Sequence, residues 1–354
     1  MLLIGGGHAH VAVLADWIRR GLPCSQATLL TPSPTLRYSG MVPGWIAGRY
    51  GRDEGTVDLA GLAKRAGAEL VLDHCIAIDP EARSVLTQSC GLVGFDVASI
   101  DTGGVGQAAR ILGDDPRLID VRPIDAFVEK LDADPPAARI AVVGGGAGGV
   151  EIAFAMKNRA GGGTEVTLVA GKEGLLPDFS KAVRRKVRKE LRRQGIAVIE
   201  QDAHFDGGDM LDPFDLVIAA LGSGAPGWPR AGGLACDEAG FIAVDPFQRS
   251  TSHPHTYAIG DVASRQDHPV GHSGVHAVMA GPIHARNLRD VMAGDGPTRI
   301  YYPRPASLYL LSTGNGSAIA SYGPFAAQGR WVARLKHWID NRWVSQYATL
   351  ASGA

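Results

Sequence analysis

A glycine-rich turn near the N-terminus constrains the fold of this chain more than any other feature. It follows the short apolar run Leu2–Ile4, and apolar residues at helical spacing follow it. In a strand–turn–helix unit, the first glycine allows the tight turn, the second lets the backbone approach a pyrophosphate, and the helix N-terminus faces its charge. Gly5 and Gly7 occupy these two places, whereas His10 stands where the third glycine is expected. The turn therefore predicts a dinucleotide-binding unit whose helix and strand pack less closely than usual.

A second glycine-rich turn, in the middle of the chain, satisfies the whole pattern through Gly144, Gly146 and Gly149. It follows an apolar run, it begins a helical pattern, and another strand-like run comes after it, which makes the signal specific. At the end of that later run, where an acidic residue would favour NAD, the chain has Ala170. Lys172 follows two residues on. A basic residue there can meet a 2′-phosphate, which favours NADP or no preference, although a solvated Lys172 is the plainer interpretation.

Three further strand-like runs end in small or acidic residues, and ligands of open α/β sheets bind beyond the carboxyl ends of strands. These ends are Asp101-Thr102-Gly103, Ala220-Leu221-Gly222 and Gly260-Asp261. Together with the two glycine-rich turns, they predict dinucleotide sites that are built from segments far apart in the sequence.

Composition places the chain among ordinary globular proteins, with 45% hydrophobic and 20% charged residues over 354 positions, enough for two or three domains. The formal net charge of -1 gives no general attraction to nucleic acid. The four cysteines are scattered, and the paired histidines lack a third ligand, so no metal site is expected. Neither a signal peptide nor an apolar run long enough to span a membrane is recognised. The sequence predicts a cytoplasmic protein.

The order of these motifs resembles that of the two-dinucleotide-domain flavoproteins, the pyridine nucleotide-disulfide oxidoreductase superfamily, over the whole chain. Within it, the chain is similar to type II NADH dehydrogenases and sulfide:quinone reductases, and more so to the flavoprotein domain fused ahead of selenophosphate synthetase. The segments that carry this last likeness are 8–11, 38–41, 312–314 and 329–331. The resemblance implies a glutathione-reductase-like α/β fold with two Rossmann-like domains, the second inserted in the first. It implies an FAD domain at residues 1–116 and 237–300 and an NAD(P) domain at residues 117–236. Residues 301–354 would form a small C-terminal interface and acceptor region.

The resemblance also implies which residues hold the FAD. Thr31 would face the adenosine ribose in place of an acid, and the backbone at Cys75 would face the adenine. Gly274 and Val275 would begin a helix whose N-terminus faces the flavin edge where reduced flavin gathers negative charge. The pyrophosphate and the ribityl chain would lie against Gly5, Gly7, His8, His10, Thr102, Gly103, Gly260 and Asp261.

Two residues near the implied meeting point of nucleotide and flavin are candidates for a catalytic role. Glu151 would orient the nicotinamide ribose, or else it only packs near the turn. His272 would give a proton to reduced flavin or quinone, or else it is a polar contact at the flavin edge. Segment 39–44, where disulfide reductases of the superfamily have a cysteine pair, contains no cysteine. The residues implied to contact the nicotinamide nucleotide are Gly144, Gly146, Gly149, Lys172 and Gly222.

These features predict an FAD-dependent NAD(P)H dehydrogenase that passes electrons to a quinone or similar acceptor without a redox disulfide. Two alternatives stay open: a soluble oxidoreductase of sulfur or selenium compounds, and an FAD-binding redox sensor with a weakened NAD(P) site. In segment 329–347, Trp331, Leu335 and Trp338 share a helical face beside basic residues. That face predicts peripheral contact with the inner side of a membrane. The more usual alternative is that it packs on the FAD domain or on a second subunit of a homodimer.

Overall fold

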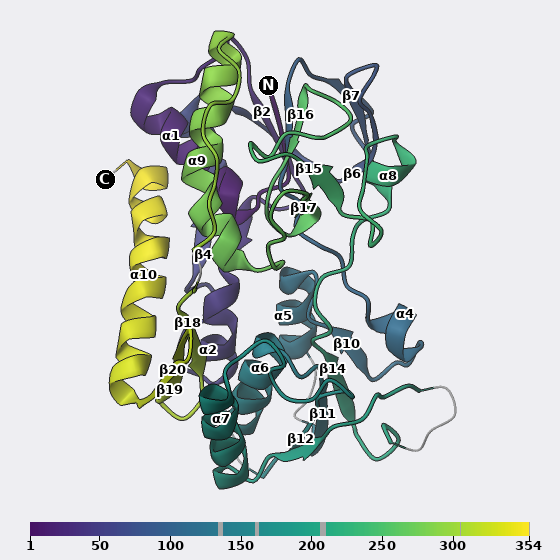
Figure 1. The fold of residues 1–354 in the computed structure, drawn as a ribbon, viewed down its shortest axis with the longest axis vertical. Helices are drawn as coiled ribbons and strands as arrows, with labels where there is room; N and C mark the ends of the chain where they lie inside the picture. The colour runs from purple at the N-terminus through teal and green to yellow at the C-terminus, as the bar shows by residue number, and fades with distance from the viewer. Residues whose placement is uncertain (134–136, 160–162, 206–209, 305, 354) are drawn as a thin grey trace.

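The computed structural model describes residues 1–133, 137–159, 163–205, 210–304 and 306–353 (Figure 1). Those residues form two α/β units and a C-terminal region that contacts both of them. A five-stranded parallel sheet lies at the centre of each unit, and smaller sheets lie around the two. The predicted α/β class with two parallel sheets is confirmed.

The first unit is built on a sheet in which every neighbouring pair of strands is parallel. In spatial order its strands are β16 (Thr256–Ala258), β9 (Ala98–Ile100), β1 (Leu2–Ile4), β2 (Thr28–Thr31) and β5 (Glu69–Leu72). Leu3 joins one buried cluster, whereas Leu2 and Ile4 join another, so apolar side chains cover both faces of the central strand. The helices packed on this sheet are α1 (His8–Arg20), α3 (Leu59–Ala66) and α9 (Gly274–Ala293).

Shorter elements complete the first unit. Its small sheets are formed by β3 (Thr35–Arg37) with β4 (Thr56–Asp58), by β6 (Cys75–Asp79) with β7 (Ser84–Thr87) and β8 (Leu92–Gly94), and by β15 (Ile242–Val244) with β17 (Ala263–Arg265). Its short helices are η1 (Ser39–Met41), α2 (Val42–Ile46), α8 (Trp228–Ala231) and η2 (Gly260–Val262).

The second unit has the same construction, with all neighbouring strands parallel. Its strands, in spatial order, are β10 (Leu118–Asp120), β14 (Leu216–Ala219), β11 (Arg139–Val143), β12 (Glu165–Val169) and β13 (Ala197–Ile199). The helices of this unit are α4 (Ala108–Leu112), α5 (Ile124–Ala133), α6 (Ala147–Lys157) and α7 (Lys181–Arg193).

The chain passes from the first sheet to the second after β9 and returns before β16, so the second unit is inserted in the first, as predicted. The outgoing and returning connections meet at Val105 and Gly224, which form an antiparallel bridge. Helix α4 packs on the second sheet, whereas α8 packs on β6 of the first unit. The boundaries at 116/117 and 236/237 stay a prediction.

The C-terminal region is an antiparallel sheet followed by one long helix. The sheet contains β18 (Tyr309–Ser312), β19 (Ala318–Tyr322) and β20 (Phe325–Gly329), and the helix is α10 (Arg330–Ser352). Helix α10 runs beside the first unit, where it packs on α3 and β4 (Figure 1). Among the described residues, no helix combines the length and the apolar character that crossing a bilayer requires.

Candidate functional site

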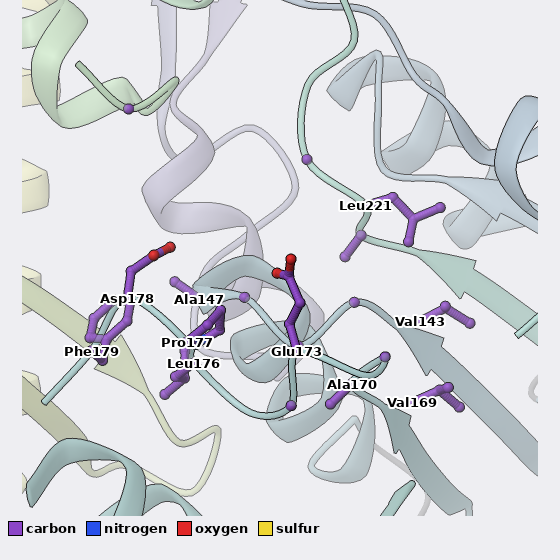
Figure 2. A pocket seen from close by; sticks show the side chains of 18 of the residues that line it. Val143, Ala147, Val169, Ala170, Glu173, Leu176, Pro177, Asp178, Phe179 and Leu221 are labelled. Carbon is purple, nitrogen blue, oxygen red and sulfur yellow. The ribbon is translucent and has the colours of Figure 1, made fainter. Parts of the chain in front are cut away.

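A cavity of about 1100 Å³ lies beyond the carboxyl ends of β11, β12 and β14 (Figure 2). The glycine turn 144–147 and the loop after β12 form much of its lining, and Gly222 borders it after β14. His272 and Ser273 of the first unit also line it, so the cavity lies between the two units. This is the edge of a parallel sheet where nucleotides bind.

The turn at the base of this cavity needs its glycines for different reasons. A Cβ at Gly144, whose φ is 134°, would lie 2.2 Å from the carbonyl oxygen of Ala220. A Cβ at Gly149 would lie 1.9 Å from the carbonyl oxygen of Gly144, so this glycine lets α6 approach the strand. Around Gly146 nothing lies within 4 Å, which leaves space for a ligand against the backbone. The tight turn at Gly144 and the close packing at Gly149 are as expected, whereas nucleotide binding at this turn stays a prediction.

At the first turn, the side chain of Asp101 takes a place that the sequence did not reveal. Its Oδ2 accepts hydrogen bonds from the backbone N–H groups of Ala9 (2.8 Å) and His10 (3.1 Å) in the first turn of α1. A Cβ on Gly7 or on Gly260 would lie 2.3 Å or 2.6 Å from the Asp101 side chain. Burial raises the pKa of Asp101 to about 7, although the two N–H groups oppose the shift. Asp101 thus caps α1 and fills the space between two motif glycines.

His10 fills the place of the third glycine with a hydrogen-bonded ring, not with a looser contact. Its Nδ1 lies 2.6 Å from the carbonyl oxygen of Gly5, and its Nε2 lies 2.8 Å from Ser99 Oγ, which is 2.7 Å from His284 Nε2. Because a carbonyl only accepts, Nδ1 of His10 carries the proton, Ser99 donates to Nε2, and His284 donates to Ser99. The three side chains are fully buried. The ring of His10 therefore points into the core, where both nitrogens are engaged, and not toward a pyrophosphate as the resemblance implied.

His8 lies at the N-terminus of α1, beside the rings of Tyr38 and Trp343 at centroid distances of 5.6 and 5.3 Å. Its Nε2 is buried and has no hydrogen-bond partner among the described residues, and burial lowers the pKa of the ring to about 4. Thr102 and Gly103 follow Asp101 at the end of β9. Thr102 is exposed, and nothing lies within 4 Å of the place that a Cβ on Gly103 would take. Because His8 Nε2 has no partner among the described residues and lies at a helix N-terminus, it suits a ligand with negatively charged oxygens.

Asp261 is the acid that follows β16, and it is held by the second unit. Its Oδ2 accepts from Arg122 Nη2 at 2.8 Å and from Ser223 Oγ at 3.1 Å. At the end of β2, Thr31 is buried and donates to the carbonyl of Ser33 at 3.4 Å. Cys75 is the first residue of β6. Gly274 and Val275 are the first two residues of α9.

The two candidate catalytic residues lie in different surroundings. His272 is exposed on the cavity wall, where its ring stacks on Phe241 at 3.8 Å. Glu151 turns toward the C-terminal region, because its Oε1 accepts the backbone N–H of Ser312 at 2.7 Å. Burial raises the pKa of Glu151, and Lys336 partly opposes that shift. The structure therefore brings Glu151 toward α10 and β18, whereas His272 borders the cavity between the two units.

Lys336 joins this buried cluster from α10. Its Nζ donates to the carbonyl of Gly40 at 3.0 Å and lies 3.2 Å from Asp340 Oδ2. Desolvation alone would lower the pKa of Lys336, but the negative charges of Glu151 and Asp340 outweigh it and raise the pKa. Lys336 is one of the basic residues of segment 329–347, and the sequence did not reveal that its side chain turns toward Gly40 and Asp340.

The four cysteines are free. They are Cys24, Cys75, Cys90 and Cys236. Burial raises the pKa of the Cys75 thiol to about 12 and also raises that of Cys236, which makes both poor nucleophiles. Within the described part of the chain, no group of three or more His, Cys, Asp or Glu residues is placed to hold a metal ion.

Comparison with known proteins gives a family match over most of the chain: residues 1–281 match the family described as pyridine nucleotide-disulphide oxidoreductase. Trypanothione reductase from Trypanosoma congolense is 27% identical over 231 residues, which make up 57% of this chain and 43% of that protein. Ferroptosis suppressor protein 1 from Xenopus laevis is 24% identical over 304 residues, which make up 78% of each protein. The match thus spans less than half of the first relative and most of the second.

Two solved structures share the fold over nearly the whole chain. The sulfide:quinone oxidoreductase from Aquifex aeolicus has a TM-score of 0.77 at 17% identity, covering 99% of this chain and 91% of that one. NDH2 from Plasmodium falciparum, in complex with NADH, has a TM-score of 0.73 at 14% identity, covering 98% of each chain. At this identity the likeness shows the fold alone, and it confirms the predicted arrangement of two dinucleotide-binding domains.

Proposed function

Because the chain belongs to the pyridine nucleotide-disulphide oxidoreductase family, we propose that it is an FAD-dependent NAD(P)H oxidoreductase. Electrons pass from the nicotinamide through the flavin to a quinone or similar acceptor. The observation that carries this proposal is the cavity between the two units. It has a complete glycine turn on one side and the start of α9 on the other. The buried Ser273 Oγ at that start has no hydrogen-bond partner among the described residues.

The first unit offers groups for each part of an FAD molecule, which when bound supplies a ring that accepts a hydride and passes electrons on. His8 Nε2 and Thr102 would hold the pyrophosphate at the N-terminus of α1, and Asp261 would meet the ribityl hydroxyls. Thr31 at the end of β2 would meet the adenosine ribose, and the backbone at Cys75 the adenine. The role of His10 is to fix the carbonyl of the turn.

On the nicotinamide side, the free backbone face of Gly146 would meet the nucleotide pyrophosphate at the N-terminus of α6. His272, on the cavity wall, would give a proton to reduced flavin or to the acceptor. Glu151 is a positioning residue in this scheme, since it is bonded to β18 and not directed into the cavity. The complete glycine turn favours an enzyme over a redox sensor.

A reaction without a redox disulfide is supported by the positions of the cysteines. Segment 39–44, which forms η1 and most of α2, contains none of them. The fold likeness to a sulfide:quinone oxidoreductase keeps sulfur compounds as a second candidate substrate class. The raised pKa values of Cys75 and Cys236 count against it, because a thiolate is the reactive form.

Anaerobic mixing with NADH or NADPH is expected to bleach the flavin of the purified protein. Serine in place of all four cysteines should leave the rate nearly unchanged, because no thiol takes part. Stopped-flow absorbance under nitrogen measures both effects, and flavin content and melting temperature serve as controls for folding. If neither nucleotide at millimolar concentration bleaches a bound flavin, the redox sensor replaces the enzyme. A large loss in the serine variant would restore the thiol relay.

Helix α10 presents an aromatic and basic face to solvent. Trp331 and Trp338 are 57% and 59% exposed, so the expectation that they pack on the FAD domain is wrong. The guanidinium of Arg342 lies 5.7 Å from the centre of a Trp338 ring. Phe325, at the start of β20 just before this helix, is 73% exposed. Exposed aromatic rings beside cations suit the headgroup layer of an anionic membrane, and we place the peripheral contact and the entry of a quinone there.

Flotation with anionic liposomes is expected to carry the wild-type protein upward at low salt, with weaker binding as salt rises. Alanine at both Trp331 and Trp338 should abolish flotation while the flavin stays bound. The matched control is alanine at Leu92, which is 73% exposed on β8 of the first unit and should leave flotation unchanged. A wild-type protein that never floats would contradict membrane contact. Dimers that dissociate in the double variant would assign the face to a second subunit.

A further inference from the structure

We propose that Asp202 selects the nucleotide and that it favours NADH over NADPH. This inference rests on the proposed function, since it concerns the same cavity. In dinucleotide-binding units, an acid at the end of the second strand binds the ribose 2′-hydroxyl and selects NAD. Strand β12 ends at Val169, and Ala170 behind it has no polar side chain. On the sequence alone, Ala170 and Lys172 favoured NADP or no preference, with a solvated Lys172 as the plainer interpretation.

The neighbouring strand supplies the missing carboxylate. Strand β13 lies parallel to β12 with Ile199 opposite Val169, so both strands end at the same edge of the sheet. Asp202 comes three residues after Ile199, and Ala170 and Asp202 both line the cavity. The acid therefore reaches this edge of the sheet from β13, the strand that follows β12 in the chain, and not from β12 itself.

The position of the Asp202 side chain is fixed by the turn after β12. Its Oδ1 accepts the backbone N–H of Lys172 at 3.0 Å, and its Oδ2 lies 2.8 Å from Lys172 Nζ. A Cβ on Gly171 would lie 3.3 Å from Oδ1, so the carboxylate lies directly against this turn. The ammonium of Lys172 holds the pKa of Asp202 below its usual range, which keeps the carboxylate ionised at neutral pH.

This arrangement changes the role that Lys172 would have in nucleotide selection. Its ammonium is already paired with Asp202, whereas a 2′-phosphate needs a free cation. This part of the cavity wall also carries the carboxylate of Glu173, which Figure 2 shows, and the imidazole of His204. A ribose hydroxyl donates to a carboxylate, but a 2′-phosphate is repelled by one. The surroundings of Asp202 therefore favour NADH, whose adenosine ribose has a free 2′-hydroxyl, over NADPH.

The test measures binding of NADH, NADPH and the probes 5′-AMP and 2′,5′-ADP to the flavin-loaded protein by calorimetry. The wild type is expected to bind NADH at least about tenfold more tightly than NADPH, since a hydrogen bond to a charged group contributes about one factor of ten. Asp202→Ala should weaken NADH by about tenfold and strengthen NADPH and 2′,5′-ADP by a similar factor, because Lys172 becomes free. A double variant that carries both Asp202→Ala and Lys172→Ala should lose the gain in NADPH affinity.

Asp178→Ala is the matched control, because it removes the same charge from the same cavity at a place well apart from Ala170 (Figure 2). It should leave the ratio of NADH to NADPH affinity unchanged. Asp202→Asn, with nearly the same shape, gives a second variant if the alanine variant loses its flavin or melts early. A wild type that prefers NADPH, or a ratio that neither Asp202 variant moves, overturns the inference while flavin bleaching still supports the proposed function. If no nucleotide binds, both are wrong.

Discussion

Alanine in place of Gly144 is expected to abolish nucleotide binding in the second unit while the first unit keeps its flavin. The φ of 134° at Gly144 is rare for a residue with a Cβ, and the added atom would lie 2.2 Å from the carbonyl oxygen of Ala220. Strained backbone and a backbone clash together should lower the free energy of unfolding of this unit by about 2–4 kcal/mol. The turn and strand β14 would separate, which removes the base of the cavity.

The matched control is Gly148→Ala in the first turn of α6, where nothing lies within 4 Å of the added Cβ. That change should leave binding unchanged and stabilise the helix slightly, because alanine is the better helix former. Calorimetric titration with NADH gives the affinity, and flavin absorbance after gel filtration gives cofactor retention. Equal affinities in the Gly144 variant and the wild type would show that the turn does not bind the nucleotide.

Acid is expected to destabilise the fold strongly, because the chain from His10 through Ser99 to His284 requires neutral rings. Burial lowers the pKa of His10 to about 4 and that of His284 to about 3, whereas an unfolded histidine has a pKa of about 6.5. Between the folded and the unfolded pKa values, the unfolded chain therefore binds more protons than the folded protein. The free energy of unfolding that the neutral rings contribute is complete above pH 6.5 and is lost as the pH falls below it. Each ring should account for about 3 kcal/mol of unfolding free energy between pH 6.5 and pH 4.

Glutamine at His284 tests this, because its amide still donates to Ser99 and does not titrate. The difference in unfolding free energy between pH 6.5 and pH 4, from urea titrations, should shrink by about 3 kcal/mol in this variant. Asp101 acts in the opposite direction, since its pKa is raised, but it contributes equally to both proteins. Glutamine at the exposed His74 is the control and should not alter the difference. An unchanged pH dependence in the His284 variant would contradict the neutral chain.

Much of the framework was predictable because it depends on residues close together in the sequence. A strand, a glycine turn and a helix occupy 19 consecutive residues from Leu2 to Arg20 and again from Arg139 to Lys157. The steric need for glycine there is local to the turn and its strand. The acid after β16 followed from a similar short pattern, whereas the start of α9 at Gly274 was implied by the family resemblance. Their order along the chain carried the family resemblance, and the resemblance implied two dinucleotide domains, one inserted in the other.

The partners of the site residues were not predictable, because sheet and helix packing bring them from distant segments. Asp101 reaches Ala9 only through the pairing of β9 with β1, and Arg122 reaches Asp261 only through the contact of the two units. Asp202 stands in for the acid missing at Ala170 because β13 lies beside β12. Spacing in the sequence contains no information about these pairings.

Helix α10 shows the same division between sequence and tertiary structure. The sequence indicated that segment 329–347 is helical and that Trp331, Leu335 and Trp338 share a face, and the observed helix runs from Arg330 to Ser352. It did not determine which face is buried. The buried stripe instead contains Asp340, Trp343 and the half-buried Lys336, because Gly40, Tyr38 and Glu151 supply hydrogen-bonding and charged partners there. Helical periodicity defines faces, but burial of a charge becomes favourable only when folding brings its partners to it.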